Sequence, residues 1–229
     1  MKLRVDIWSD VVCPWCYIGK RRFERALGTF EHAKDVDVVW HSFELDPSAP
    51  RVRENISHAE HLAKKYRVGA AQAQAMIDRV TSAAAAEGLE FHYERAKGGN
   101  TFDAHRVIHF AQTKGLGAQM KERLLKGYFT DGAPIGETAG LVPLAVEVGL
   151  PEAEVADVLA TDRYAKEVRD DENLARELGI SGVPFFVIGG RLGVSGAQAP
   201  EVLVGALERG WAEQPTEIVD GAVCGPDGC

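Results

Sequence analysis

Residues 2–28 read KLRVDIWSDVVCPWCYIGKRRFERALG and change from an alternating pattern to a helical one within a few positions. Leu3, Val5 and Ile7 alternate with charged side chains, which is typical of a strand with one buried face. Pro14 then suits the first position of a helix, and apolar side chains recur after it at helical spacing. The segment therefore predicts a strand followed directly by a helix.

Two cysteines, Cys13 and Cys16, stand where this strand passes into the helix. A dithiol catalyst needs one ionised, exposed thiol and a second thiol near enough to resolve a mixed disulfide. Unsatisfied N–H groups and the positive end of the helix dipole would face the Cys13 sulfur, which favours the thiolate. We expect Cys16, one turn later, to face the core and to keep the higher pKa.

A zinc site is the alternative use of the C-x-x-C spacing. Zinc would require two further ligands, and the nearest candidate, His41, stands alone at the far end of a strand, where simple packing is the more common role. The sequence around Cys13 and Cys16, a strand followed by the motif and a helix, favours the redox interpretation. We therefore predict no metal and no organic cofactor.

The rest of the chain divides into a strand-rich part at each end and a helical part between them. Residues 36–45 are β-branched and aromatic, which predicts a second strand, whereas residues 56–178 show almost wholly helical patterns. Residues 183–194 predict a hairpin around Gly189-Gly190, and Pro200 opens a last helix. The predicted fold class is α/β, a thioredoxin-like fold with an inserted all-helical domain.

The same patterns predict the limits of four segments. They are a first thioredoxin-like part (residues 1–55), a helical insertion whose last helix could pack on the sheet (56–178), a second thioredoxin-like part (179–212) and a flexible cysteine-containing tail (213–229).

Pro184 is expected to lie against the dithiol. In a thioredoxin-like site, a cis proline precedes the third strand, and the backbone of the residue before it, here Val183, pairs with an extended substrate. X-Pro bonds tolerate the cis form far better than other peptide bonds do. A trans proline that opens a strand is the alternative.

Four stretches in this order resemble the DsbA family, FrnE-like branch, over residues 2 to about 210: DVVCPWCYIGK (10–20), HSFELDP (41–47), NTFDAHR (100–106) and GISGVPFFV (179–187). The resemblance implies a thioredoxin fold with a helical insertion, and a protein disulfide oxidoreductase or isomerase. It also implies that Cys13 is the attacking thiol, Cys16 the resolving thiol and Pro184 the cis proline.

Proteins on the same architecture include kappa-class glutathione transferases and 2-hydroxychromene-2-carboxylate isomerases, which carry serine where this chain has Cys13. A glutathione-dependent isomerase or transferase is thus the alternative function, and glutathione retained as a free thiol would support it. Because both cysteines are present, electron exchange is the simpler use, with glutathione as a possible co-substrate.

Other residues near the motif are assigned to substrate binding or support. Pro14, Trp15, Val183 and Pro184 are the predicted substrate-binding residues, and Trp15 is either a platform for substrate or a hydrophobic residue at a helix start. Near the site, a helix of the insertion is expected to be capped and oriented by Asn100, Thr101, His105 and Arg106.

The tail contains a second close pair, Cys224 and Cys229, separated by Gly-Pro-Asp-Gly. Terminal cysteines can be unpaired, but disulfides that form in a reducing compartment are usually transient or functional. The pair is therefore a candidate second redox centre that could exchange with Cys13.

Composition limits the partners. With 34 acidic and 26 basic residues the formal net charge is −8, which argues against nucleic acid as a partner. Charges at every second position of the N-terminus do not fit a signal peptide, and no later segment is apolar for long enough to span a bilayer. We expect a cytoplasmic protein that acts on protein or small-molecule thiols and disulfides and that could form a homodimer.

Overall fold

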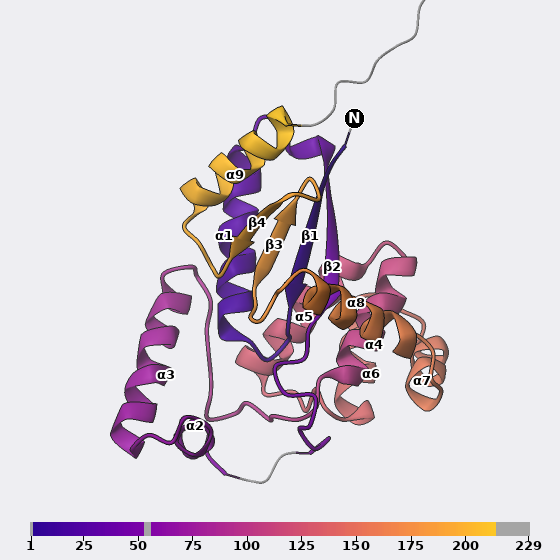
Figure 1. Cartoon of the computed structure of the whole chain (residues 1–229). Helices are drawn as coiled ribbons and strands as arrows, with labels where there is room; N and C mark the ends of the chain where they lie inside the picture. Colours follow the sequence, from indigo (N-terminus) through magenta and orange to yellow (C-terminus); the bar gives the residue numbers. More distant parts are fainter. Residues whose placement is uncertain (1, 53–55, 214–229) are drawn as a thin grey trace, which may run out of the picture.

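The computed structural model of the chain describes residues 2–52 and 56–213 (Figure 1). The strands in this part of the chain are β1 (Leu3–Ser9), β2 (Val36–Ser42), β3 (Phe185–Ile188) and β4 (Leu192–Ser195). Its α-helices are α1 (Pro14–Thr29), α2 (His58–Tyr66), α3 (Ala70–Ala85), α4 (Phe102–Thr113), α5 (Gly117–Lys126), α6 (Thr138–Glu147), α7 (Glu152–Ala160), α8 (Ala165–Glu177) and α9 (Pro200–Ala212). A 3₁₀ turn (Ala33–Asp35) precedes β2, and a π-helical turn (Gly127–Asp131) follows α5.

The four strands form one mixed sheet in the order β2-β1-β3-β4. β1 and β2 are parallel, whereas β3 is antiparallel to both β1 and β4. The hairpin between β3 and β4 turns at Gly189 and Gly190, whose φ angles are 60° and 70°. Glycine adopts such positive φ angles without steric cost, which explains the two glycines and confirms the predicted hairpin.

The two faces of the sheet bury different side chains. Leu3, Val5 and Ile7 of β1 point toward α1 and α9 and join a hydrophobic core with Phe186 and Leu207. The alternation seen in the sequence therefore corresponds to this buried face.

On the opposite face Trp8 packs with Ala175 of α8 and with Ile180. Its indole N–H donates a hydrogen bond to the Asp171 carbonyl at 3.0 Å. Helix α8, the last of the helices between β2 and β3, thus covers the second face of the sheet.

The segment between β2 and β3 is helical, and within its described residues it contains no strand. Its helices share a large apolar core. Val11, in the loop after β1, belongs to the same core, as do Tyr17 and Ile18 of α1. Figure 1 shows these helices grouped at the end of the sheet where β1 leads into α1. The fold is therefore thioredoxin-like and α/β with inserted helices, as the sequence predicts.

The second strand is shorter than predicted. β2 ends at Ser42 rather than at residue 45, because its neighbour β1 ends at the paired residue Ser9. The Leu45 N–H instead donates to the Asp10 carboxylate at 2.8 Å.

None of the helices in the described part of the chain is long and apolar enough to cross a bilayer.

Candidate active site

Cys13 lies at the junction of β1 and α1 as the N-cap residue of the helix. Its φ and ψ angles of −89° and 113° are extended, and Pro14 follows as the first helical residue. The Cys16 N–H donates to the Cys13 carbonyl at 3.1 Å, so both cysteines belong to the first turn, and both thiols are free. The unsatisfied N–H groups of α1 and the positive end of its dipole therefore lie at Cys13.

The prediction that Cys13 is exposed is wrong. Only 4% of Cys13 and 2% of Cys16 is accessible to solvent. Cys13 lines a cavity, however, whereas Cys16 is not among the residues that line it. The cover over Cys13 comes from segments far along the chain, which the pattern around the motif could not show.

The predicted proline lies beside Cys13. The Val183–Pro184 peptide bond is cis, and the Cys13 thiol donates to the Val183 carbonyl with Sγ and O 3.6 Å apart. A Cβ atom at Gly19 would come within 2.9 Å of Pro184 Cγ. Glycine at this position thus lets α1 approach Pro184 closely.

Cys16 lies behind Cys13 in a closed environment. Burial raises the pKa of the Cys16 thiol well above its usual range, and the neighbouring Cys13 raises it further. The Lys121 ammonium and the hydrogen-bonded backbone N–H of Asp10 act in the opposite direction. Lys121 Nζ donates a hydrogen bond to the Ser9 carbonyl at 3.1 Å. The Ser9–Asp10 peptide therefore lies between Lys121 and Cys16, with its carbonyl bound to the lysine and its N–H bound to the thiol.

A buried polar cluster surrounds this peptide. Burial lowers the pKa of Lys121 to about 8, although the two cysteines and Asp10 oppose the shift. Asp10 Oδ1 lies 3.3 Å from His105 Nε2. Burial lowers the pKa of His105, whereas the contact with His105 helps to hold the pKa of Asp10 below its ordinary value against its own burial. Protonatable groups are therefore packed directly behind Cys16.

Lys121 was not among the predicted site residues, although its position on an apolar helix stripe is a signal. Lys121 lies on the buried stripe of α5 with Met120, Leu124 and Leu125, and only 1% of the lysine is exposed. A lysine on an apolar stripe requires a polar partner, which here is the Ser9 carbonyl.

Of the residues expected to cap and orient the insertion, not all make the predicted contacts. Asn100 Oδ1 accepts a hydrogen bond from the Phe102 N–H at 2.9 Å and so caps α4, whereas the Thr101 side chain makes no capping bond. His105 contacts Asp10, as described above. Arg106 donates to Asp103 at 2.8 Å within α4.

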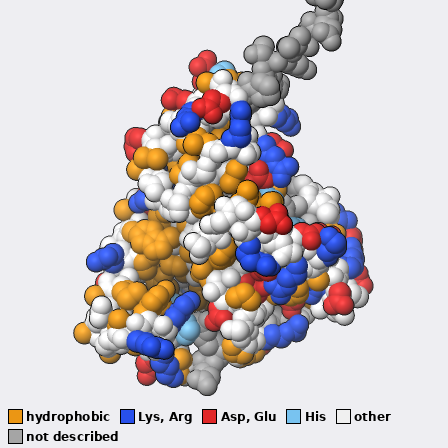
Figure 2. Space-filling view, in the orientation of Figure 1, with side chains coloured by type: hydrophobic (Ala, Val, Ile, Leu, Met, Phe, Trp, Pro, Cys, Tyr) orange, Lys and Arg blue, Asp and Glu red, His pale blue; other side chains and the backbone are white. Residues whose placement is uncertain are grey.

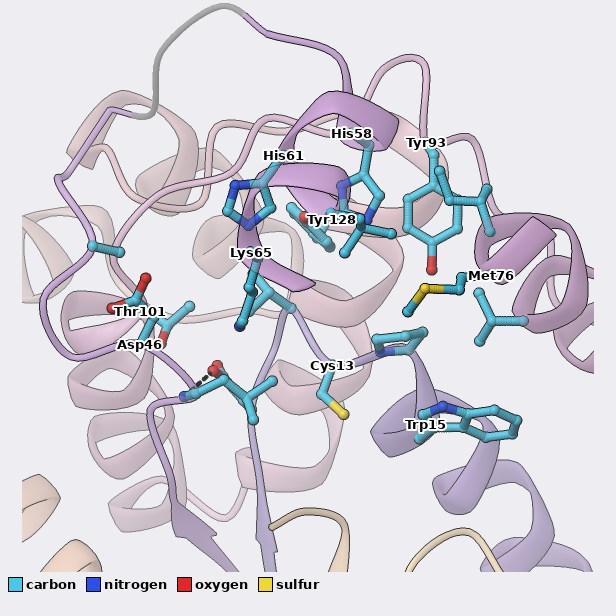
Figure 3. A pocket seen from close by; sticks show the side chains of 18 of the residues that line it. Cys13, Trp15, Asp46, His58, His61, Lys65, Met76, Tyr93, Thr101 and Tyr128 are labelled. Atoms are coloured by element: carbon cyan, nitrogen blue, oxygen red, sulfur yellow. Dashed lines mark hydrogen bonds between the residues drawn. The ribbon is translucent and has the colours of Figure 1, made fainter. Parts of the chain in front are cut away.

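A cavity of about 340 Å³ lies beside Cys13 (Figure 3). Its walls come from the start of α1, the loop after β2, helices α2 and α3, the segment before α4 and the loop before Pro184. Most of the wall is apolar, and polar groups on it include those of Lys65, Tyr93 and Thr101. The cavity therefore joins the inserted helices to the thioredoxin-like part at the thiol.

The structure brings most of the predicted site residues together. Pro14, Trp15 and Val183 line the cavity with Cys13, and Trp15 is 40% exposed. Figure 2 shows hydrophobic side chains gathered on the visible surface near the junction of α1 and α3. Sequence analysis missed the contributions of α2, α3 and Tyr93 to this site, because nothing in their local patterns links them to Cys13.

Two further predictions concern the second cysteine pair and a metal site. Cys224 and Cys229, the candidate second pair, lie outside the described residues. Within residues 2–52 and 56–213, no three His, Cys, Asp or Glu side chains are grouped as a metal site.

Comparison with known proteins identifies the family. Residues 4–208 match the DSBA-like thioredoxin domain. The chain belongs to this family. DsbA-like proteins are thiol-disulfide oxidoreductases, in agreement with the resemblance seen in the sequence.

Individual relatives of this DsbA-like chain cover nearly its whole length. The crystal structure of a probable DsbA oxidoreductase from Streptomyces coelicolor is 44% identical, covers 99% of this chain and 98% of its own, and gives a TM-score of 0.88. YwbO of Bacillus subtilis is 29% identical over 90% of this chain and 96% of its own. The cytosolic disulfide reductase DsbM of Pseudomonas aeruginosa, 19% identical with a TM-score of 0.63 over 91% of this chain and 98% of its own, shares the fold.

Proposed function

We propose that this DsbA-like chain exchanges disulfides with its substrates, with Cys13 as the attacking thiol and Cys16 as the resolving thiol. The observation that carries the proposal is the difference between the two cysteines. Cys13 lines the cavity and contacts the Val183 carbonyl, whereas Cys16 lies behind it with a pKa raised by burial. Only the thiol on the cavity can meet an incoming sulfur, and only a thiolate attacks it.

In the reducing direction, the Cys13 thiolate attacks one sulfur of a substrate disulfide. A bond forms between Cys13 and that sulfur while the substrate S–S bond breaks, and the other half leaves as a thiolate that takes up a proton. Cys16 then loses its proton, attacks the Cys13 sulfur and releases the second substrate thiolate. Two electrons pass from the chain to the substrate, and the oxidising direction runs through the same mixed disulfide.

The proposal includes the finer features predicted from the sequence. These are membership of the FrnE-like branch, a cytoplasmic location, protein or small-molecule thiols and disulfides as substrates with glutathione as a co-substrate, and exchange without a metal or organic cofactor. Cys224 and Cys229 are proposed as a second redox pair that exchanges with Cys13 and Cys16.

Single cysteine substitutions test the roles. In a background with Cys224→Ser and Cys229→Ser, Cys13→Ser should abolish exchange with a disulfide substrate. Cys16→Ser should accumulate a mixed disulfide at Cys13, detected by peptide mass spectrometry after alkylation. Equal trapping by both variants contradicts the assignment. Glutathione retained as a free thiol without any mixed disulfide would instead support the isomerase or transferase class.

The same experiment examines the tail. With Cys224 and Cys229 present, the Cys16→Ser variant should form a disulfide between Cys13 and a tail cysteine, because a tethered thiol acts at high effective concentration. Identical products in the two backgrounds would show that the tail takes no part.

A further inference from the structure

Tyr93 places a hydroxyl group in the cavity beside Cys13. Only 9% of the residue is exposed, and its ring stacks on His58 with centroids 4.4 Å apart. The hydroxyl points into the cavity (Figure 3) and makes no hydrogen bond within residues 2–52 and 56–213. Burial raises the pKa of Tyr93, and Tyr128 and Cys13 raise it further. At neutral pH the hydroxyl therefore stays protonated and can donate a hydrogen bond to a ligand.

The wall beside Tyr93 is helical and apolar. Met76, Ile77 and Val80 of α3 and Leu62 of α2 line the cavity. The backbone N–H and C=O groups in the interior of a helix bond within the helix, so this wall offers no partner to an incoming polypeptide backbone. Burying unpaired peptide groups there would be costly, whereas an aromatic or branched aliphatic group fits such a wall.

The volume sets the size of the occupant. A cavity of about 340 Å³ lies at the low end of the range of roughly 300–1,000 Å³ that holds small molecules in proteins. Cys13 is part of the wall, so the occupant must be attached to the reacting sulfur by only a few atoms.

We propose that the cavity binds the apolar body of a low-molecular-weight thiol or disulfide, that the Tyr93 hydroxyl donates a hydrogen bond to a carbonyl oxygen of the same molecule, and that Tyr93 and the α3 wall determine substrate choice. The inference rests on the disulfide exchange proposed above. Attack by the Cys13 thiolate on R–S–S–R forms Cys13–S–S–R and releases RSH after protonation. The group R then occupies the cavity until Cys16 displaces the second RSH and closes the Cys13–Cys16 disulfide.

Two matched disulfides test the proposal. The disulfides of N-benzoylcysteamine and N-acetylcysteamine share the reacting sulfur, the linker and the carbonyl group, and they differ in the aromatic ring. The full chain with Cys224→Ser and Cys229→Ser is reduced, freed of reductant and mixed with each disulfide, and its thiols are followed by rapid alkylation and mass spectrometry. The chain's own dithiol supplies both electrons, and we expect the benzoyl compound to react at least about tenfold faster.

Amino-acid substitutions then show which residues cause the preference for the benzoyl compound. Tyr93→Phe should slow the benzoyl compound about fivefold, the effect of one neutral hydrogen bond, while Tyr164→Phe, outside the cavity, should leave the rate unchanged. Met76→Trp should fill the cavity and reduce the preference to below about threefold. Ala75→Trp, on the exposed side of α3 away from the cavity residues, is the matched control. Unfolding by urea shows whether each variant keeps the native fold, and the conservative Tyr93→Phe tests the proposal even if Met76→Trp does not fold.

The outcomes separate the two proposals. A wild-type chain that reacts with neither disulfide contradicts both the proposed function and this inference. Reaction with both compounds at equal rates contradicts only the inference, as does a rate with the benzoyl compound that Tyr93→Phe leaves unchanged. A disulfide-linked peptide that loses as much rate as the benzoyl compound in Tyr93→Phe would show that the cavity serves polypeptides, and this too overturns the inference.

Discussion

At the scale of single residues, Lys121 shows how a distant side chain can affect the proposed chemistry. It reaches the Ser9 carbonyl from α5, and its charge opposes the effect of burial on Cys16. Cys16 must lose its proton before it can resolve a mixed disulfide, so any group that favours the Cys16 thiolate favours this step.

Replacement of Lys121 by methionine removes the charge and keeps most of the apolar stem. We predict that Lys121→Met raises the pKa of Cys16 further and slows resolution by about tenfold near neutral pH, the effect of about one pKa unit. The measurement is the rate at which a preformed Cys13 mixed disulfide decays as a function of pH. Lys126→Met, at the exposed end of α5, serves as the control. An unchanged pH profile in Lys121→Met would show that the lysine is only structural.

At the scale of elements, two glycines of α1 have opposite roles. Gly19 faces Pro184, whereas nothing lies within 4 Å of a Cβ atom added at Gly28. Glycine inside a helix costs roughly 0.5–1 kcal/mol relative to alanine, so a glycine in a packed position requires a steric reason.

Alanine substitutions separate the two roles. We predict that Gly28→Ala raises the free energy of unfolding by about 0.5–1 kcal/mol through helix propensity alone. Gly19→Ala should lower it by about 1–3 kcal/mol, the usual cost of overpacking, and should slow disulfide exchange, because the new methyl group displaces Pro184 from Cys13. Urea unfolding and thiol alkylation provide the two measurements. Equal stabilisation by both substitutions would contradict the close contact with Pro184.

At the scale of the whole molecule, a buried charge cluster joins α8 to the sheet. His41 of β2 lies between Asp6 of β1, at 2.7 Å, and Asp171 of α8, at 2.5 Å, and its ring stacks on Trp8. The cluster extends to His109, whose Nε2 lies 3.0 Å from Asp171 Oδ2. Although burial acts to lower the pKa of His41, the hydrogen bonds that its ring donates to Asp171 and Asp6 raise the pKa to about 9.

This cluster predicts a pH dependence of stability. The folded-state pKa of His41 lies above the ordinary value of 6.5, so its stabilising contribution is fully present below about pH 6.5 and is lost as pH rises through 9. The shift corresponds to at most about 3 kcal/mol. In urea unfolding between pH 6 and 9.5, the difference between wild type and His41→Gln should be largest at pH 6 and should shrink as pH rises.

The control is His92→Gln, a substitution of a half-exposed histidine. It should change stability little over the same range. A difference between wild type and His41→Gln that stays constant with pH would mean that the pKa of His41 does not change on folding.

Local patterns were sufficient for the features that depend on near neighbours. The strand, the cysteine motif and α1 follow one another within a few residues, and the hairpin turns at two adjacent glycines with positive φ. Alternation and helical spacing express which face of an element is buried, so they predict elements before any packing is known. The order of these elements, with helices between two strand-rich parts, was enough to predict the fold class.

The cavity, the burial of Cys13 and the charges behind Cys16 were decided by tertiary structure. Tyr93, Lys121 and Val183 reach the first turn of α1 from positions about 80 to 170 residues along the chain. No local periodicity records which distant side chains will meet, because these contacts depend on how the helices pack around a shared core. The sequence alone predicted the two thiols and the order of their roles, whereas the packing of the inserted helices decided that Cys13 lines a cavity and which side chains form its wall.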